Sequence, residues 1–156
     1  MHTTIALELG YEFTVKAALA DVFAVLSDVP TSASFYPGVD QLVDLGGNTY
    51  RWEMEKIGIN HLTLQTVYAS RYTSSKAKGT VNWVPVPGEG NARVSGSWTL
   101  SAAKPGTHVA LAVQAELDLP LPALMKPVVH PLVEAEFERL TERYIDNLIE
   151  RFGGEV

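Results

Sequence analysis

Apolar and polar residues alternate along the first segment of the chain, Thr3 to Lys16, as expected for a β-strand with one buried face. Ile5, Leu7 and Leu9 begin its apolar side. The alternation shifts near Gly10, which predicts a β-bulge at that position. We therefore expect the chain to open with a strand that is interrupted once.

Two short helical pieces are predicted next. In AALADVFAVLSDVP the apolar residues recur three or four positions apart, as on the buried side of an amphipathic helix, and Pro30 prevents its simple continuation. The stretch TSASFYPGV predicts one more helical turn, which Thr31 or Ser32 can cap and Pro37-Gly38 ends.

From Val39 to Leu117 the apolar residues repeat at every second position, and turn signals such as Gly46-Gly47-Asn48 and Pro105-Gly106 separate the runs. Strands joined by such short turns pair antiparallel with their neighbours in a meander. The segment Gly88 to Arg93 is a hairpin loop in this scheme. The pattern predicts six strands, over residues 39–45, 49–57, 61–73, 77–85, 92–102 and 107–117.

A long amphipathic helix is predicted at the end of the chain. Beyond Pro122, apolar residues follow at steps of three or four up to Phe152, and Gly153-Gly154 supplies a C-terminal stop. Pro131 is predicted to be the first helical residue, because proline is tolerated at that position but disrupts a helix interior. The helix would then contain about 22 residues and be roughly 33 Å long.

This order of elements predicts a single α+β domain over residues 1–156, in the order β-α-α-β6-α. Its seven-stranded curved antiparallel sheet would wrap around the long C-terminal helix. A helix is about 10 Å wide with its side chains, which is narrower than the concave face of such a sheet. The space beneath the helix is therefore expected to stay partly unfilled and to form an elongated apolar pocket.

Three parts of the chain carry a family resemblance: the opening ALADVFAVLSDV with FYPGV, the six-strand meander, and the closing GSWTLSAAKPGTHVALAVQAELDLPLPALMKPVVHPLVEAEFERL. Together they resemble the START-related helix-grip superfamily (SRPBCC), which includes polyketide cyclases and dehydrases, plant allergen-type ligand carriers and coenzyme Q-binding proteins. Within it, the segment PGVDQLVDLGGNTYRWEMEKIGI resembles the branch named after a carbon monoxide dehydrogenase protein. The resemblance implies a helix-grip fold with a cavity for a hydrophobic small molecule, and it specifies a fold rather than a reaction.

Most candidate pocket residues lie on the inner faces of the predicted strands, because alternate side chains of a strand share one face. The mouth of the pocket is expected near Phe35 and Tyr36 and near the proline-rich loop after Leu117, which leads to Met125. All three tryptophans fall on the inner face. The predicted ligand-binding residues are Phe35, Tyr36, Trp52, Met54, Leu64, Tyr68, Trp83, Trp98, Leu111, Val113, Met125, Val129 and Val133.

The composition excludes several partners and chemistries. Because the chain has no cysteine, disulfides, thiolate metal sites and a cysteine nucleophile are excluded. Its net charge is −6, and it has no cationic cluster suited to nucleic-acid phosphates. The start, MHTTIALELGYEF, lacks the features of a secretion signal, and no run approaches the roughly 18 apolar residues of a membrane span. We expect a cytoplasmic protein without an integral membrane segment or a nucleic-acid partner.

The sequence contains no evident catalytic or metal-binding motif. The four histidines are scattered without the spacing of a metal site, and no cofactor is predicted. The nearest approach to a nucleophile elbow, Val94 to Ser97, lies within a strand pattern. Tyr50 and Tyr68 are the inward hydroxyls that could take part in chemistry, but a phenol without a positioned base or oxyanion partner is poorly equipped for proton transfer.

Three functions are compatible with these features. The first, which the inner apolar residues favour, is a non-enzymatic protein that binds or carries a lipid, a quinone or a polyketide-like aromatic molecule. The second is a cyclase, aromatase or dehydrase, which the family resemblance implies and which could steer a reactive chain by cavity shape alone. The third is a protein-interaction or maturation-factor module, in which the acidic row Glu134, Glu138, Glu142 and Asp146 would contact a partner.

Overall fold

The structure is a computed structural model that describes residues 2–59 and 62–156. Its strands are β1 (Thr3–Val15), β2 (Val39–Gly46), β3 (Thr49–Met54), β4 (Ile57–Ile59), β5 (Leu62–Leu64), β6 (Val67–Ser75), β7 (Thr80–Gly90), β8 (Ala92–Ala102) and β9 (Thr107–Leu119). Its helices are α1 (Leu19–Leu26), α2 (Val29–Ala33), the 3-10 turn η1 (Ala123–Met125) and α3 (Lys126–Arg151).

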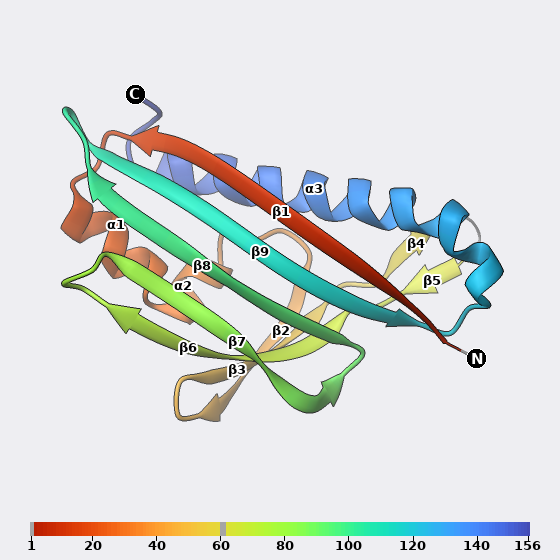
Figure 1. Cartoon of the computed structure of the whole chain (residues 1–156). Coiled ribbons are helices and arrows are strands. Elements are labelled where there is room, and N and C mark those ends of the chain that lie inside the picture. The colour runs from red at the N-terminus through yellow and green to blue at the C-terminus, as the bar shows by residue number, and fades with distance from the viewer. Residues whose placement is uncertain (1, 60–61) are drawn as a thin grey trace.

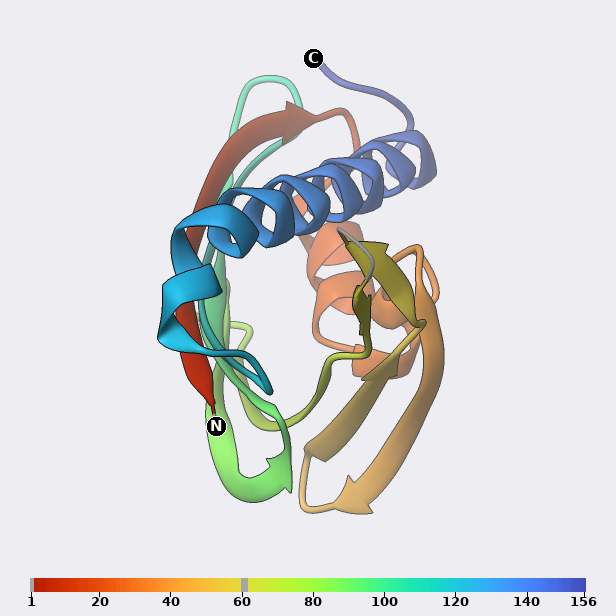
Figure 2. The same cartoon turned by 90° about the vertical axis from the view of Figure 1, so that its right-hand side faces the viewer.

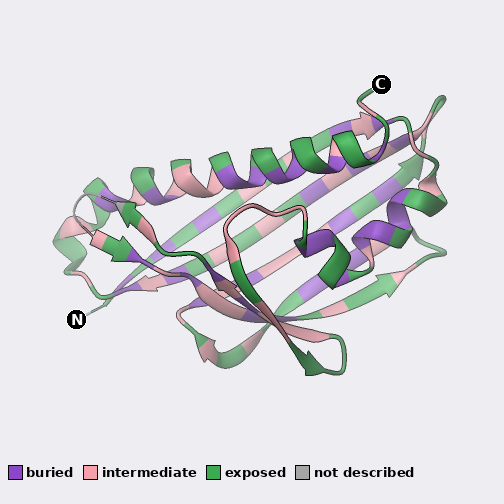
Figure 3. Cartoon of the chain, turned by 180° about the vertical axis from the view of Figure 1, so that it is seen from behind, coloured by how far each residue is buried: buried purple, intermediate pink, exposed green. Residues whose placement is uncertain are grey.

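Seven strands form one antiparallel sheet in the order β1-β9-β8-β7-β6-β3-β2, and β4 pairs with β5 separately. The sheet curves, and α3 crosses its concave side with α1 and α2 beside it (Figures 1 and 2). Buried and exposed residues alternate along the strands, and the outward side of α3 is exposed (Figure 3). The predicted α+β helix-grip fold is confirmed, with a sheet that does not close on itself.

The first strand runs without interruption. β1 pairs with β9 in one continuous register from Thr3 opposite Leu119 to Val15 opposite Thr107. The predicted bulge near Gly10 is therefore wrong. Tyr11 and the buried residues beyond it continue the inner row that Leu9 belongs to, so the alternation keeps its phase through the glycine.

Two of the predicted strands are each broken in the structure. The chain leaves the large sheet after Met54 and rejoins it at Val67, and the residues between include the small β4–β5 pair. Backbone hydrogen bonds mark the break, because Glu55 N donates to Gly38 O at 2.7 Å and Met54 N donates to Thr66 O at 2.9 Å. The β4–β5 pair lies beside the start of α3 (Figure 2).

The segment predicted as a hairpin loop after residue 87 belongs largely to β7. Gly90 pairs with Tyr68 across β6, and only Asn91 separates β7 from β8. The Asn91 side chain accepts a hydrogen bond from Val67 N and donates one to Gln65 O, both at 2.9 Å. Gly90 has a φ of 77° and lies so close to Val67 that a Cβ would sit 2.0 Å from its carbonyl oxygen, so only glycine fits.

Both proline-based predictions of helix starts need correction. α2 begins at Val29, with Pro30 inside its first turn, where a missing N–H costs no helical hydrogen bond. α3 begins at Lys126 rather than at Pro131, which lies within the helix. Val129 and Val133 on either side of Pro131 are fully covered by the sheet, and their burial offsets the hydrogen bond that the proline removes.

Candidate ligand-binding cavity

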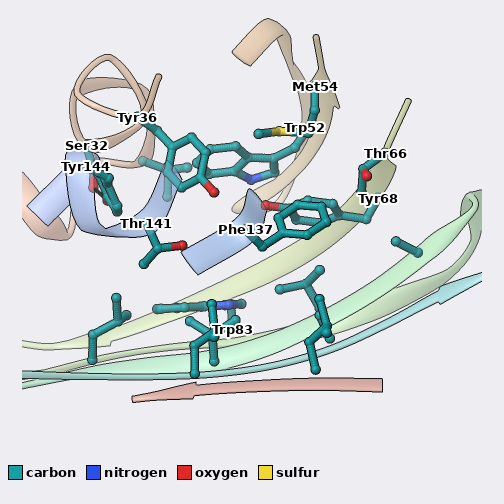
Figure 4. Close-up of a pocket in the computed structure, with 18 of the residues that line it drawn as sticks. Ser32, Tyr36, Trp52, Met54, Thr66, Tyr68, Trp83, Phe137, Thr141 and Tyr144 are labelled. Atoms are coloured by element: carbon teal, nitrogen blue, oxygen red, sulfur yellow. Dashed lines mark hydrogen bonds between the residues drawn. The ribbon is translucent and has the colours of Figure 1, made fainter. Parts of the chain in front are cut away.

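A cavity of about 120 Å³ lies between the inner face of the sheet and α3 (Figure 4). This space is well above the roughly 10–15 Å³ that admits one water molecule. Strands β1, β8 and β9 form its floor, α3 and α2 contribute side chains from above, and β3 and β6 supply a side wall. The lining residues are Leu7, Leu9, Leu26, Val29, Ser32, Tyr36, Trp52, Met54, Thr66, Tyr68, Tyr72, Trp83, Ala92, Val94, Trp98, Leu111, Val113, Ala115, Leu117, Phe137, Thr141 and Tyr144.

Aromatic side chains brace each other around the cavity. The rings of Trp52 and Tyr68 stack with centroids 5.9 Å apart and an interplanar angle of 11°. Tyr36 meets the edge of Trp52 at 6.2 Å and lies 5.0 Å from Tyr144, while Tyr72 lies 5.6 Å from Trp83. Such contacts hold large rings in fixed orientations, so the wall keeps its shape around the open space.

The position of Trp83 depends on a glycine. Gly96 faces Trp83 across β7 and β8, on the inner side of the sheet. A Cβ at Gly96 would lie 2.5 Å from the indole ring and 2.4 Å from the carbonyl oxygen of Ala112. The missing side chain therefore lets the indole lie against the sheet, as Figure 4 shows, instead of standing up into the cavity.

The polar atoms of the cavity are hydroxyl and indole groups. The hydroxyls of Tyr36, Tyr68 and Thr141 and the indole nitrogen of Trp83 surround the same space (Figure 4). Two further contacts fix the surrounding wall. Trp52 Nε1 donates a hydrogen bond to the Tyr72 hydroxyl at 2.9 Å, and the hydroxyls of Ser32 and Tyr144 share a short hydrogen bond.

The buried phenols of the cavity stay protonated. Loss of hydration raises the pKa of Tyr36 to about 12, and the neighbouring Thr141 hydroxyl opposes part of that rise. Burial likewise raises the pKa values of Tyr68, Tyr72 and Tyr144. At neutral pH these groups are uncharged and can donate hydrogen bonds, but they cannot act as bases.

The lining of the cavity carries no charge in the part of the chain that the structure describes. None of the lining residues named above is acidic or basic. Over the same described residues, no three histidines or carboxylates come together as metal ligands would. His108 contacts Thr14 and Glu12 on the outer side of the sheet, and His61 lies outside the described residues. The cavity is thus built for an apolar occupant with few polar contacts.

Eight of the residues predicted to bind a ligand line this cavity, and five do not. The eight come from the strands or from the segment after α2. They are Tyr36, Trp52, Met54, Tyr68, Trp83, Trp98, Leu111 and Val113. The residues that lie elsewhere are Phe35, Leu64, Met125, Val129 and Val133.

The misplaced residues belong to solid parts of the core. Leu64, Val129 and Val133 pack with one another in a separate apolar cluster under the start of α3, and Met125 rests against it. The sheet and the helix meet directly there, so no space remains between them. Phe35 packs near the other end of α3, where its carbonyl accepts a hydrogen bond from Asn147 Nδ2 at 2.9 Å.

Tyr50, one of the two tyrosines singled out for chemistry, lies away from the cavity. It occupies the first half of β3 on the inner side, as predicted, but there the strand has passed beyond the cavity. Its ring borders a separate surface hollow with Val39 and Leu42 and contacts Tyr72 edge-on at 6.0 Å. Tyr68 alone of this pair faces the cavity.

Sequence reasoning misses several lining residues. Phe137, Thr141 and Tyr144 follow each other at helical spacing and form the underside of α3, so the periodicity carries a usable signal. Tyr72 shares the strand parity of Tyr68 and could be included on the same basis. Ser32 and Thr66 carry no such signal. The lining residues missing from the predicted set are Leu7, Leu9, Leu26, Val29, Ser32, Thr66, Tyr72, Ala92, Val94, Ala115, Leu117, Phe137, Thr141 and Tyr144.

A curved sheet gripping a long helix around an apolar cavity defines a class of ligand-binding proteins. Residues 7–153 match the family model described as polyketide cyclase / dehydrase and lipid transport, so the protein belongs to this family. No curated protein matches the sequence. Over residues 2–59 and 62–156, none of the helices combines the length and apolarity required to cross a membrane.

Solved structures share the fold at low sequence identity. The ZhuI aromatase/cyclase from Streptomyces sp. R1128 superposes with a TM-score of 0.69 at 13% identity, over 95% of this chain and 94% of that chain. A START superfamily protein from Mycobacterium smegmatis gives 0.65 at 15% identity, over 96% and 97% of the two chains. A Thermus thermophilus protein gives 0.65 at 18% identity, over 96% and 97%. At these identities the likeness establishes the fold alone.

Proposed function

We propose that the protein binds one hydrophobic small molecule in the cavity between the sheet and α3, and that it serves as a carrier for that molecule. The observation that supports this most is the enclosed apolar space itself. Protein interiors are normally packed without voids, and an unfilled cavity of this size costs on the order of a few kcal/mol of stability. A bound apolar guest would restore the missing contacts.

The shape and chemistry of the lining narrow the ligand. Flat walls made by Trp52, Tyr68 and Trp83 suit a planar or ring-containing molecule. The donors on Tyr36 and Thr141 can orient one oxygen acceptor, such as a carbonyl. A molecule that places a free carboxylate inside would bury a charge without a cationic partner among the described lining residues, which is unfavourable.

The carrier proposal is preferred over a cyclase because of the proton-transfer groups. Within the described lining, the titratable groups are phenols that burial keeps protonated at neutral pH. A cyclase or dehydrase that relies on an internal base would find none there. The cyclase alternative therefore rests on cavity shape and on the Tyr68 hydroxyl as a proton donor, and the branch of the family to which the chain belongs stays a prediction.

The test combines extraction with titration. The purified protein is extracted with organic solvent for mass spectrometry and titrated with a naphthoquinone and with a fatty acid of similar size, while quenching of tryptophan fluorescence is recorded. We expect saturable binding of the quinone at one site and an affinity for the fatty acid that is lower by about tenfold or more. Absence of both a copurified molecule and quenching would contradict the proposal.

The same titration separates a carrier from an enzyme. In a carrier, Tyr68→Phe changes affinity for the quinone modestly, because a single neutral hydrogen bond contributes about 1 kcal/mol. In an enzyme that uses this hydroxyl, the variant would retain binding of a polyketide-like substrate and lose its conversion. Tyr50→Phe is the matched control, since Tyr50 lies outside the cavity.

A further inference from the structure

The start of α3 and the turn before it expose an unusual row of apolar side chains. Leu124 is 85% exposed, Val128 is 51% exposed and Leu132 is 43% exposed. The three residues are spaced four apart, so they lie along one side of η1 and α3. We call Leu124, Lys126, Val128 and Leu132 the helix-start face. Large apolar side chains exposed side by side are a sign of an interaction surface.

The charge of this face differs from that of the rest of the molecule. From Pro120 to Leu132, every exposed residue is apolar except Lys126. The chain has 18 acidic residues, yet none falls within this stretch. Asp118, just before it, is paired with Arg93 at 2.9 Å, and the next acidic residue is Glu134. The helix-start face is therefore apolar with a positive charge, on a protein whose net charge is negative.

The helix-start face also lies next to the cavity. It occupies the end of the molecule where η1, the first turns of α3 and the β4–β5 pair come together (Figures 1 and 2). Val129 and Val133, beneath the exposed row, are buried against Leu64 of β5. Phe137 follows Val133 by one helical turn and lines the cavity.

We propose that the helix-start face docks on the surface of an anionic lipid bilayer. Apolar side chains on one side of a helix insert into the boundary between headgroups and acyl chains, and a nearby lysine is attracted to anionic headgroups. The absence of acidic residues from Pro120 to Leu132 removes the repulsion that would oppose this contact. Docking in this orientation brings the cavity end of α3 to the bilayer, where a hydrophobic ligand is dissolved.

A bilayer fits this face better than a protein partner does. Three apolar side chains expose a few hundred Å² at most, whereas a stable protein interface buries roughly 800 Å² on each side. Insertion into a bilayer needs no complementary pocket on the partner. Docking is also a separate property from ligand binding, because none of the four residues of the helix-start face lines the cavity.

The test is sedimentation of the full chain with vesicles of phosphatidylcholine alone or mixed with phosphatidylglycerol. We expect the wild type to bind the mixed vesicles, to bind phosphatidylcholine less, and to lose affinity as salt is added. Leu124→Asp should lower the partition coefficient at least about tenfold on both vesicles. Lys126→Glu should lower it about fivefold or more on the anionic vesicles only.

Val84→Asp is the matched control, because Val84 is a 47% exposed apolar residue on β7, far along the chain from α3. It should bind vesicles as the wild type does. The proposal is overturned if the wild type ignores anionic vesicles, or if Val84→Asp and Leu124→Asp weaken binding equally. It is also overturned if Leu124→Asp only dissociates a dimer. Quinone binding by Leu124→Asp should equal that of the wild type, so a failure of docking is distinguishable from a failure of the carrier proposal.

Discussion

Replacing Ala115 with phenylalanine abolishes binding of an apolar ligand, with a loss of affinity of at least about a hundredfold. Ala115 lines the cavity from β9, where it lies opposite Leu7 of β1 and Val94 of β8. The added phenyl ring points into a space of about 120 Å³ and takes the place that a ligand ring would occupy. The native fold survives, because the ring fills existing space instead of displacing packed neighbours.

The measurement is the fluorescence titration with the naphthoquinone, together with a thermal melt. Ala112→Phe is the matched control, because Ala112 lies on the same strand and is exposed on the outer side of the sheet. It adds an identical ring outside the cavity and should leave the affinity unchanged. A folded Ala115→Phe protein that binds the quinone as tightly as the wild type would show that the ligand does not occupy this cavity.

Replacing Gly96 with alanine has the largest expected effect on stability, a loss of about 3 kcal/mol in the free energy of unfolding. The new methyl group would meet the Trp83 ring at 2.5 Å and the carbonyl oxygen of Ala112 at 2.4 Å. The indole can move only toward the cavity, and the carbonyl belongs to the backbone of β9, so both the β8–β9 pairing and the cavity floor are disturbed.

Urea unfolding followed by circular dichroism measures this change. Gly10→Ala is the matched control, because its Cβ would meet Leu111 O at 3.9 Å, an ordinary contact, in the equally regular strand β1. This control should be neutral or should stabilise the protein by up to about 1 kcal/mol. Equal unfolding free energies for Gly96→Ala and the wild type would contradict the close packing of Trp83 against the sheet.

The sheet and its pairing could be predicted from local pattern. Period-two alternation and regularly spaced turns determine which residues form strands, and short connections determine that neighbours pair antiparallel. The predicted inner side is correct for Trp52, Trp83 and Trp98, because parity along a strand decides the face. These features depend on residues close together in the sequence.

The breaks in the strands could not be predicted in this way. Alternation continues across Glu55 and across Gln65, so nothing local announces that the chain leaves the sheet there. The break depends on Gly38 and Thr66, which accept hydrogen bonds from a distant or displaced segment. The start of α3 shows the same limit, since burial of Val129 against the sheet overrides the preference of Pro131 for the first helical position.

The extent of the cavity along α3 is likewise beyond the reach of the sequence. Val129, Val133, Phe137, Thr141 and Tyr144 all lie on the sheet side of one helix and follow the same periodicity. The first two fill the interior completely, whereas the last three border open space, because the sheet curves away from the helix between them. That separation depends on the curvature of the whole sheet, and no helical pattern reports it.

The claim that an apolar space remains between sheet and helix and admits a guest is tested most directly by a crystal structure under xenon pressure. Xenon enters dry apolar cavities without needing a specific contact. We predict a xenon atom between Trp83 and Phe137, present in the wild type and absent in Ala115→Phe. Side chains packed together across this space, with no xenon bound, would contradict the account.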